Sequence, residues 1–192
     1  EKVLKLCSDG FGVLENYLLS MMRECPHEYF NGGPRSSNLK FNFIDGVTKI
    51  NEHEISLLAR YGLKINKERF KDKHSRIQNF MLENDKNTLA MEIPVWLMPH
   101  EFVGYNVLFK SKEVLTGHID ILRIKENNIW IWDYKPNAQK EKYAPTQTFF
   151  YAYMLSKRTG IPLKYFKCGY FDHNVAYVYE PQEDSVLKLN KQ

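Results

Sequence analysis

Two neighbouring apolar segments, each carrying a single carboxylate, constrain the fold of this chain more than any other feature. Residues 114–124 and 128–133 are rich in Val, Ile and Trp and are separated by a short polar break. This pattern is typical of two strands joined by a turn. Asp120 lies inside the first segment and Asp133 ends the second. A carboxylate in apolar surroundings is costly unless another group compensates its charge, so the pattern predicts a sheet built around paired acids.

Apolar periodicity along the rest of the chain predicts an α/β core with a helical N-terminal addition. Apolar runs bounded by polar residues indicate strands, and apolar residues spaced three and four apart indicate helices. The further strands are expected at 89–97, 103–109, 165–171 and 175–179, and the helices at 11–23, 52–61, 67–83 and 143–158. With 192 residues the chain can bury one sizeable core. We expect the mostly helical addition over residues 1–66 and the core over residues 67–192.

Charge is distributed unevenly along the core. Residues 74–133 carry 6 Lys and Arg against 8 Asp and Glu, whereas residues 134–192 carry 9 against 5. An acidic middle followed by a basic tail is compatible with a carboxylate site beside an anion-binding surface. Ordinary surface charge gives the same imbalance, so charge alone does not decide between the two.

The cysteines and the N-terminus suggest the setting of the protein. Cys7, Cys25 and Cys168 are odd in number and form no CxxC pair, which disfavours a disulfide framework, a cysteine zinc site and a four-cysteine cluster. We therefore expect a reducing, intracellular (cytoplasmic) setting. No apolar run approaches the ~18 residues that a membrane span needs. The chain starts without Met or a signal-peptide pattern, which suggests either a trimmed N-terminus or an excised domain.

A divalent cation would resolve the conflict between two carboxylates on adjacent strands, which otherwise repel and raise each other's pKa. Mg²⁺ favours a few carboxylates, retained waters and phosphate oxygens. Strand alternation places Lys135 on the same side as Asp133, with Tyr134 on the other side. An ammonium there would orient a water or stabilise charge on a phosphate. The alternative is a buried ion-pair group without catalysis.

The order of these residues resembles the PD-(D/E)XK nuclease superfamily, in particular its RecB-like branch. Gly117-x-x-Asp120 is followed by Asp133-Tyr134-Lys135 and then by Gln147-x-x-x-Tyr151 on a predicted helix. Glu92 on a preceding strand and His74 on the helix before the sheet complete the set. The resemblance implies a restriction-endonuclease-like core, a mixed sheet flanked by helices in the order αβββαβ. It resembles the exonucleases of CRISPR adaptation, several of which carry an iron–sulfur cluster on one N-terminal and three C-terminal cysteines. Here Cys168 is the one cysteine after the metal-site motifs, so we expect no iron–sulfur cluster.

The resemblance also implies roles for individual residues. A Mg²⁺ or Mn²⁺ ion would be bound by His74, Asp120, Asp133 and the backbone carbonyl of Tyr134, and Lys135 would be the catalytic lysine. Gln147 and Tyr151, four apart on one helix face, would support that lysine or contact DNA. Glu92 would hold a second metal, a water or a hydrogen bond to a ligand.

Packing is the alternative for several of these side chains. A histidine on an apolar helix face, such as His74, is more often a core or surface residue than a ligand. His118 shares its strand face with Asp120, but packing is favoured over a ligand or phosphate contact. Tyr151 lies in an aromatic run typical of a core, and Glu92 is as consistent with an ordinary strand residue as with a site.

The implied function is a divalent-metal-dependent DNA nuclease that hydrolyses phosphodiester bonds. We expect exonuclease-like action on single strands or ends, in DNA repair, recombination or defence, with no membrane and with the N-terminal region open to a protein partner. A non-catalytic nucleic-acid binding or assembly module is the first alternative, and a hydrolase of small phosphoesters is the second. Basic residues expected to follow the DNA backbone are Lys140, Lys142, Lys157, Arg158, Lys164 and Lys167.

Overall fold

The computed structural model describes residues 2–8 and 10–185 of the chain. Six α-helices are defined in these residues: α1 (Lys2–Cys7), α2 (Gly12–Glu24), α3 (Glu54–Ile65), α4 (Lys73–Asn84), α5 (Tyr105–Phe109) and α6 (Ala144–Thr159). Six strands accompany them: β1 (Thr48–Asn51), β2 (Thr88–Leu97), β3 (Leu115–Lys125), β4 (Asn128–Tyr134), β5 (Phe166–Phe171) and β6 (Val175–Tyr179).

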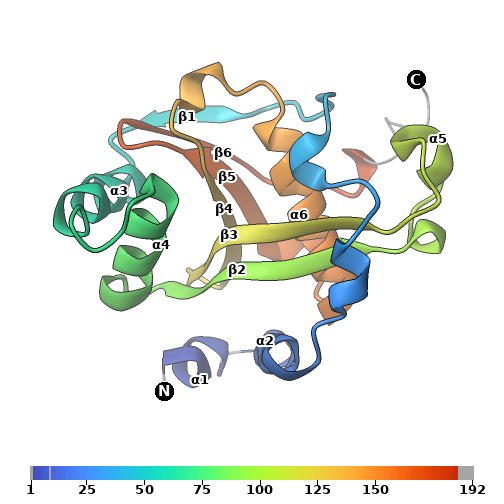
Figure 1. The fold of residues 1–192 in the computed structure, drawn as a ribbon, viewed down its shortest axis with the longest axis horizontal. Helices are drawn as coiled ribbons and strands as arrows, with labels where there is room; N and C mark the ends of the chain where they lie inside the picture. Colours follow the sequence, from blue (N-terminus) through green and yellow to red (C-terminus); the bar gives the residue numbers. More distant parts are fainter. Residues whose placement is uncertain (1, 9, 186–192) are drawn as a thin grey trace.

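All six strands form one mixed sheet in the order β1-β6-β5-β4-β3-β2 (Figure 1). β2, β3 and β4 follow one another in antiparallel pairs, whereas β4 and β5 run parallel. The parallel pair requires a crossover, and α6 provides it between β4 and β5. The expected mixed sheet flanked by helices, with the order αβββαβ from α4 to β5, is confirmed.

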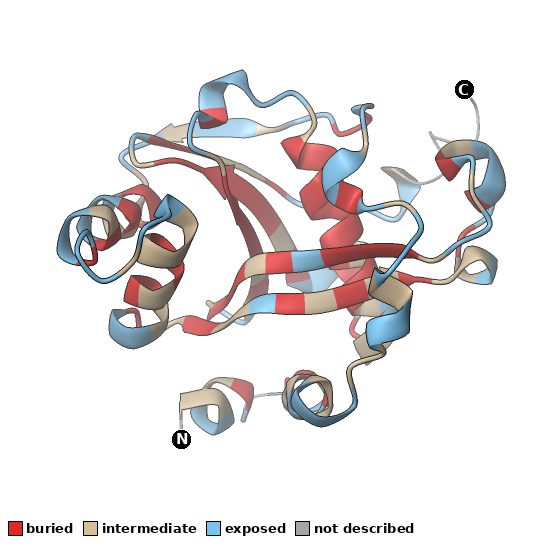
Figure 2. Cartoon of the chain, in the orientation of Figure 1, coloured by how far each residue is buried: buried red, intermediate tan, exposed pale blue. Residues whose placement is uncertain are grey.

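Helices cover both faces of the sheet and create two cores (Figures 1 and 2). On one face, α3 and α4 bury residues such as Ile55 and Ile77 against Trp132. On the other face, α6 buries Phe149 and Phe150 in the larger core, which α1 and α2 extend beside β2. Apolar burial at about 25 cal/mol per Å² makes these two cores the main stabilising contribution of the fold. The sheet is therefore fixed from both sides.

Three expectations about individual elements are wrong. Residues 103–109 are not a strand; they contain the short helix α5, in which Tyr105 and Phe109 pack on each other at helical spacing. Tertiary packing here overrides the β-propensity of a segment rich in Val, Tyr and Phe. The predicted helix 67–83 begins only at Lys73, because the Asp72 side chain accepts a hydrogen bond from Ser75 N and caps α4 there.

The third difference is a strand that the sequence analysis missed. β1 is short and mostly exposed, and it pairs antiparallel with β6 at the edge of the sheet. Four residues of this kind show no alternation strong enough to recognise. The expected helix over 52–61 is present as α3, displaced toward the C-terminus. A division of the chain at residue 66 stays a prediction.

No helix in the described part of the chain is long and apolar enough to cross a membrane.

A network of ion pairs joins β3 to α3 and to the residue that follows α4. Arg123 Nε donates to Asp85 Oδ2 at 2.8 Å, and Arg123 Nη1 donates to Glu54 Oε1 at 2.9 Å. Thr88 Oγ1 also donates to Asp85 Oδ2, at 2.7 Å. Burial opposes the ionised form of Asp85, but the hydrogen bonds from Arg123 and Thr88 and the charge of Arg123 together lower its pKa.

We predict that Asp85→Asn destabilises the protein by about 3 kcal/mol at pH 7, because the buried Arg123 guanidinium loses its buried carboxylate and keeps only the half-exposed Glu54. A lowered pKa in the folded state stabilises the protein above the unfolded value of about 3.9 and is lost as pH falls through the folded value. The difference between variant and wild type should therefore shrink below pH ~4. Urea unfolding across pH 2–7 measures it.

Glu68→Gln is the matched control, because Glu68 is exposed and its removal should change the unfolding free energy by no more than about 0.5 kcal/mol. An Asp85→Asn variant that loses nothing at pH 7, or whose loss persists at pH 2, would contradict the assignment of this pair.

Candidate active site

A cleft of about 250 Å³ opens where β3 and β4 separate, between the sheet and α6. It gathers six of the residues singled out from the sequence, which come from α4, β3, the end of β4 and α6. They are His74, Asp120, Asp133, Lys135, Gln147 and Tyr151. The other lining residues are Arg35, Ser37, Thr116, Gly117 and His118.

The cleft exists because the β3–β4 ladder stops short. The two strands pair only from Ile121 opposite Trp132 onward, and β3 then continues to Leu115 beside β2 alone. Beyond the last pair, Tyr134 N donates to the side chain of Asp120, to Oδ2 at 3.0 Å. A carboxylate thus takes the place of a ladder carbonyl, and the strands diverge at the two acids.

Gly117 makes the narrow inner wall of the cleft possible. A Cβ at this position would lie 2.3 Å from Tyr151 Cε1 and 2.6 Å from Ser36 Oγ. No side chain fits there without displacing the ring of Tyr151, so the glycine of the Gly117-x-x-Asp120 motif has a steric reason. The close approach brings α6 against β3 at the level of the acids.

Asp133 and Lys135 are tied to α6 through one amide. Lys135 Nζ donates to Gln147 Oε1 at 3.0 Å and lies 2.8 Å from Asp133 Oδ2. Gln147 Nε2 donates to Asp133 Oδ1 at 2.9 Å and to Tyr151 Oη at 2.8 Å. The amide accepts from the cation and donates to the anion, which fixes its orientation and holds the carboxylate and the ammonium in register.

His74 reaches the same cleft from the first turn of α4. Its Nε2 lies 3.1 Å from the carbonyl oxygen of Tyr134 and 3.7 Å from Asp120 Oδ2. The imidazole also packs edge-on against the Tyr134 ring at 5.0 Å. One ring nitrogen, one backbone oxygen and one carboxylate therefore converge at the end of β4, in the cleft that Asp133 and Lys135 also line.

Burial and like charge disfavour ionisation of the two acids. Burial, and then the charge of Asp133, raises the pKa of Asp120 well above its usual range. Burial likewise raises the pKa of Asp133, although Lys135 opposes the change. Burial also opposes the ammonium form of Lys135, but the charge of Asp133 and its hydrogen bond outweigh it and raise the pKa of Lys135. The cleft therefore carries anionic groups that favour an added cation.

The donors that converge are of the kinds that Mg²⁺ and Mn²⁺ accept: two carboxylates, a backbone carbonyl and an imidazole. Asp133 Oδ2 is buried and, apart from the ion pair with Lys135, forms no well-directed hydrogen bond, so it has acceptor capacity left. Within residues 2–8 and 10–185, no group of three or more His, Cys, Asp or Glu side chains is spaced to hold a metal by itself. The mixed donor set fits a hard divalent cation.

Glu92 lies beside the cleft rather than in its lining. It stands across from Asp120 on β2, is exposed, and has a left-handed backbone with φ 51°. Gln78 on α4 donates to Glu92 Oε1 and, at 3.2 Å, to the backbone oxygen of Asp120. Backbone strain of this kind in a non-glycine residue is frequent at functional sites. Gln78 was missed by the sequence analysis, although it follows His74 by one helical turn.

Other predicted contacts are placed outside the cleft. Lys140 and Lys142 are exposed in the connection between β4 and α6 but do not line it. Arg158 is paired with Glu101 and Lys167 with Glu180, so neither is an unpaired basic side chain. The ring of Tyr151 is buried, and it meets the cleft beside Gln147. His118 lines the cleft and packs on Phe30.

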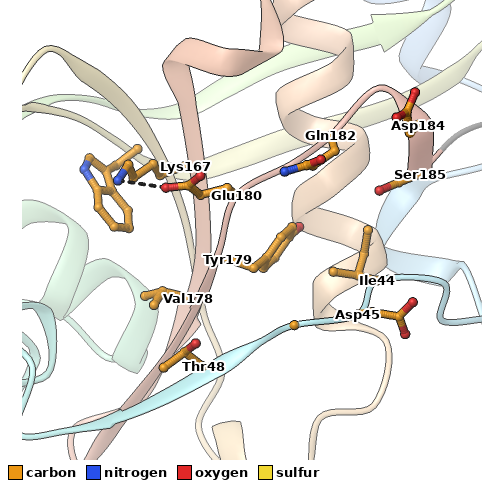
Figure 3. Close-up of a pocket in the computed structure, with 12 residues that line it drawn as sticks. Ile44, Asp45, Thr48, Lys167, Val178, Tyr179, Glu180, Gln182, Asp184 and Ser185 are labelled. Atoms are coloured by element: carbon orange, nitrogen blue, oxygen red, sulfur yellow. Dashed lines mark ion pairs between the residues drawn. The ribbon is translucent and has the colours of Figure 1, made fainter.

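A second pocket, of about 510 Å³, lies beside β1 and β6 and contains none of the predicted catalytic or metal-binding residues. Figure 3 shows the Lys167–Glu180 ion pair at one end of it, with Tyr179 and Ile44 at its centre. Its polar groups come from scattered positions and do not converge as those of the cleft do. The smaller cleft is therefore the candidate active site.

One family model matches more than half of the chain. The model of the PD-(D/E)XK nuclease superfamily matches residues 48–186, which include every helix and strand from β1 to β6. No curated protein matches the chain.

We predict that Asp120→Asn raises the melting temperature of the metal-free protein by about 2–4 °C, the shift that about 1 kcal/mol produces in a domain of this size. The variant removes a buried charge that Asp133 repels and keeps an oxygen for Tyr134 N. Excess Mn²⁺ should raise the melting temperature of the wild type, because a ligand that binds only the folded state stabilises it. The variant should lack this rise.

Calorimetric scans with EDTA and with Mn²⁺ measure both effects, and Glu68→Gln serves as the carboxylate control away from the cleft. A variant that keeps the full Mn²⁺ response would show that Asp120 is not a ligand.

Proposed function

The chain belongs to the PD-(D/E)XK nuclease superfamily, and from this membership we propose that it is a divalent-metal-dependent nuclease that hydrolyses phosphodiester bonds in DNA. The observation that carries the proposal is the meeting of Asp120, Asp133 and Lys135 in one cleft. Two acids and a lysine from separate positions of the chain have no packing reason to gather in a water-accessible slot. A metal-assisted hydrolysis would use all three, the acids to hold the metal and the lysine to stabilise charge on the phosphate.

The metal would be Mg²⁺ or Mn²⁺, held by His74, Asp120, Asp133 and the carbonyl of Tyr134. When bound, such an ion polarises a phosphate oxygen and lowers the pKa of a coordinated water. With the His74 imidazole among its ligands, the site would accept Mn²⁺ as readily as Mg²⁺. Glu92, held by Gln78, would orient a water or bind a second ion at the cleft rim.

Lys135 would supply positive charge next to the phosphate that is attacked. Its ammonium is already fixed by Asp133 and Gln147, so little reorganisation is needed when charge develops on the phosphate oxygens. The same group would orient the attacking water through its remaining proton. Gln147 positions the lysine, and Tyr151 in turn fixes the Gln147 amide.

Within the superfamily, we place the chain in the RecB-like branch and propose exonuclease-like action on single strands or ends, in DNA repair, recombination or defence. Support comes from the Gln147–Tyr151 pair on α6 and from His74 on α4, both of which reach the cleft. The cleft is small, about 250 Å³, which suits one strand better than a duplex. Lys140 and Lys142 would bind the strand as it leaves the cleft.

The cellular location and a protein partner are proposed from the cysteines and from the two N-terminal helices. Cys7, Cys25 and Cys168 are free thiols, which supports a reducing, intracellular location. Helices α1 and α2 expose apolar side chains such as Leu4 and Met22, which supports a protein partner at the N-terminal region.

A non-catalytic binding module on the same fold is the second candidate. Such a module has no need for the lysine or for paired acids, and this chain has them in contact. A hydrolase of small phosphoesters is the third, and cleavage of a mononucleotide ester at the rate of a polymer would favour it.

We predict metal-dependent degradation of end-labelled linear DNA, faster for single strands than for duplex, and no degradation in EDTA. Circular single-stranded and duplex DNA in the same assay separate exonuclease from endonuclease action, since only an endonuclease cuts a circle. DNA that is retained in a filter assay but never cut, with either metal, would favour the binding module.

We predict that Lys135→Ala lowers kcat for DNA cleavage by about 10²–10³-fold, the usual cost of removing one group that stabilises developing charge. Metal binding, followed as the Mn²⁺-induced rise in melting temperature, should persist. Lys86→Ala removes an exposed lysine outside the cleft and should cut at the wild-type rate. A Lys135→Ala variant as fast as the wild type would refute the role.

A further inference from the structure

The segment before β1 contributes one wall of the cleft. Residues 33–38 run along β3, where Thr116 N donates to Pro34 O at 3.0 Å and Ser36 Oγ donates to Thr116 O at 2.8 Å. Arg35 forms a parallel bridge with Thr116 across the same contact. These bonds join positions about eighty residues apart, so the segment is held by tertiary pairing.

Gly33 allows the segment to come this close. Its φ is +76°, and a Cβ there would lie 2.7 Å from the carbonyl oxygen of Val114. The left-handed conformation and the lack of space both require glycine at this turn. The backbone of Arg35 is therefore fixed on its N-terminal side by the turn at Gly33 and on its C-terminal side by the hydrogen bond of Ser36 to Thr116.

The pairing register of β3 places Arg35 along the same edge of β3 from which β4 diverges. Thr116 pairs with Trp96 of β2 on one side, so its bridge to Arg35 lies on the opposite side, the side on which β4 pairs with residues 121–125. The end of β4 and the 33–38 segment thus face each other across the gap in the ladder. Arg35 and Lys135 both line the cleft between them.

The charge of Arg35 is not used within the described part of the chain. Its side chain makes one long hydrogen bond, from Nη2 to Phe30 O at 3.4 Å, and no carboxylate there pairs with it. Lys135, the other Lys or Arg in the lining, is engaged by Asp133 and Gln147. A guanidinium has five donors in a planar fork that matches two phosphate oxygens, and Arg35 is exposed enough to present it.

We propose that Arg35 binds a phosphate of the substrate strand at the mouth of this cleft, on the side opposite to β4. This proposal rests on the proposed nuclease function for the identity of the substrate, a nucleic-acid strand. Ser37, which also lines the cleft, adds a hydroxyl to the same phosphate site. The segment 33–38, which lies outside the residues that the family model matches, is then part of the substrate site.

The test compares Arg35→Ala with Arg23→Ala, which removes an exposed arginine of α2 outside the cleft. Both are made in the full chain carrying Lys135→Ala, so that a fluorescent single-stranded oligonucleotide is not cut during titration. Anisotropy with Mn²⁺ at several salt concentrations gives Kd. We expect Arg35→Ala to raise Kd about tenfold and to reduce the salt dependence by about one phosphate contact. Arg23→Ala should change neither.

Cleavage kinetics with Lys135 intact give a second readout. Arg35→Ala should raise KM about tenfold with kcat within about threefold, and Arg35→Lys should restore part of the binding, since it keeps the charge and loses the fork. An unchanged melting temperature separates lost binding from lost folding. Wild-type Kd and salt slope in Arg35→Ala would overturn the proposal, whether or not the wild type cuts DNA. If neither the wild type nor any variant cuts DNA, but Arg35→Ala still binds the oligonucleotide more weakly than the wild type, the nuclease function is overturned and the phosphate site is kept.

Discussion

The hydrogen bond from Tyr134 N to the Asp120 carboxylate determines the shape of the whole site. In a regular ladder this N–H would bond a carbonyl of the neighbouring strand, and β4 would continue along β3 to its end. The side-chain acceptor ends the pairing instead and lets the strands diverge. The divergence opens the cleft, leaves one edge of β3 free for Arg35, and places Asp133 and Lys135 at the opening rather than in a closed sheet.

This arrangement is unfavourable in isolation, and the rest of the fold compensates for it. The carboxylates of Asp120 and Asp133 repel each other, and the backbone of Glu92 is held at φ 51° next to them. The two apolar cores on the faces of the sheet and the buried Arg123–Asp85 pair stabilise the same strands from outside the cleft. A frame that is stable by apolar packing can retain a strained, charged opening, and stability given up there is typical of sites that act on a ligand.

Local pattern was enough to predict most of the sheet, because alternation of apolar and polar residues marks its longer strands. That Asp133 and Lys135 share a side followed from their spacing of two, whereas Gln147 and Tyr151 were expected from the resemblance to the superfamily. The strand predicted over 103–109 failed because aromatic packing within α5 decides its conformation. Arg35 was not predicted at all, since its place depends on pairing with Thr116, and no local signal in a loop rich in Gly and Ser reports such a partner.

The reacting groups and Arg35 lie on parts of the fold that are held with different firmness. This difference determines which of them can change without loss of the core. The acids and the lysine come from β3 and β4, both buried in the sheet, where a shift of a strand would disturb the two cores at once. Arg35 is carried by a segment fixed through a few hydrogen bonds at the edge of β3. Groups that must be placed precisely therefore lie on the frame, and the group that would select the strand lies where the sequence is free to vary without cost to the core. Changes in residues 33–38 would alter which phosphate is held while leaving the reacting groups in place.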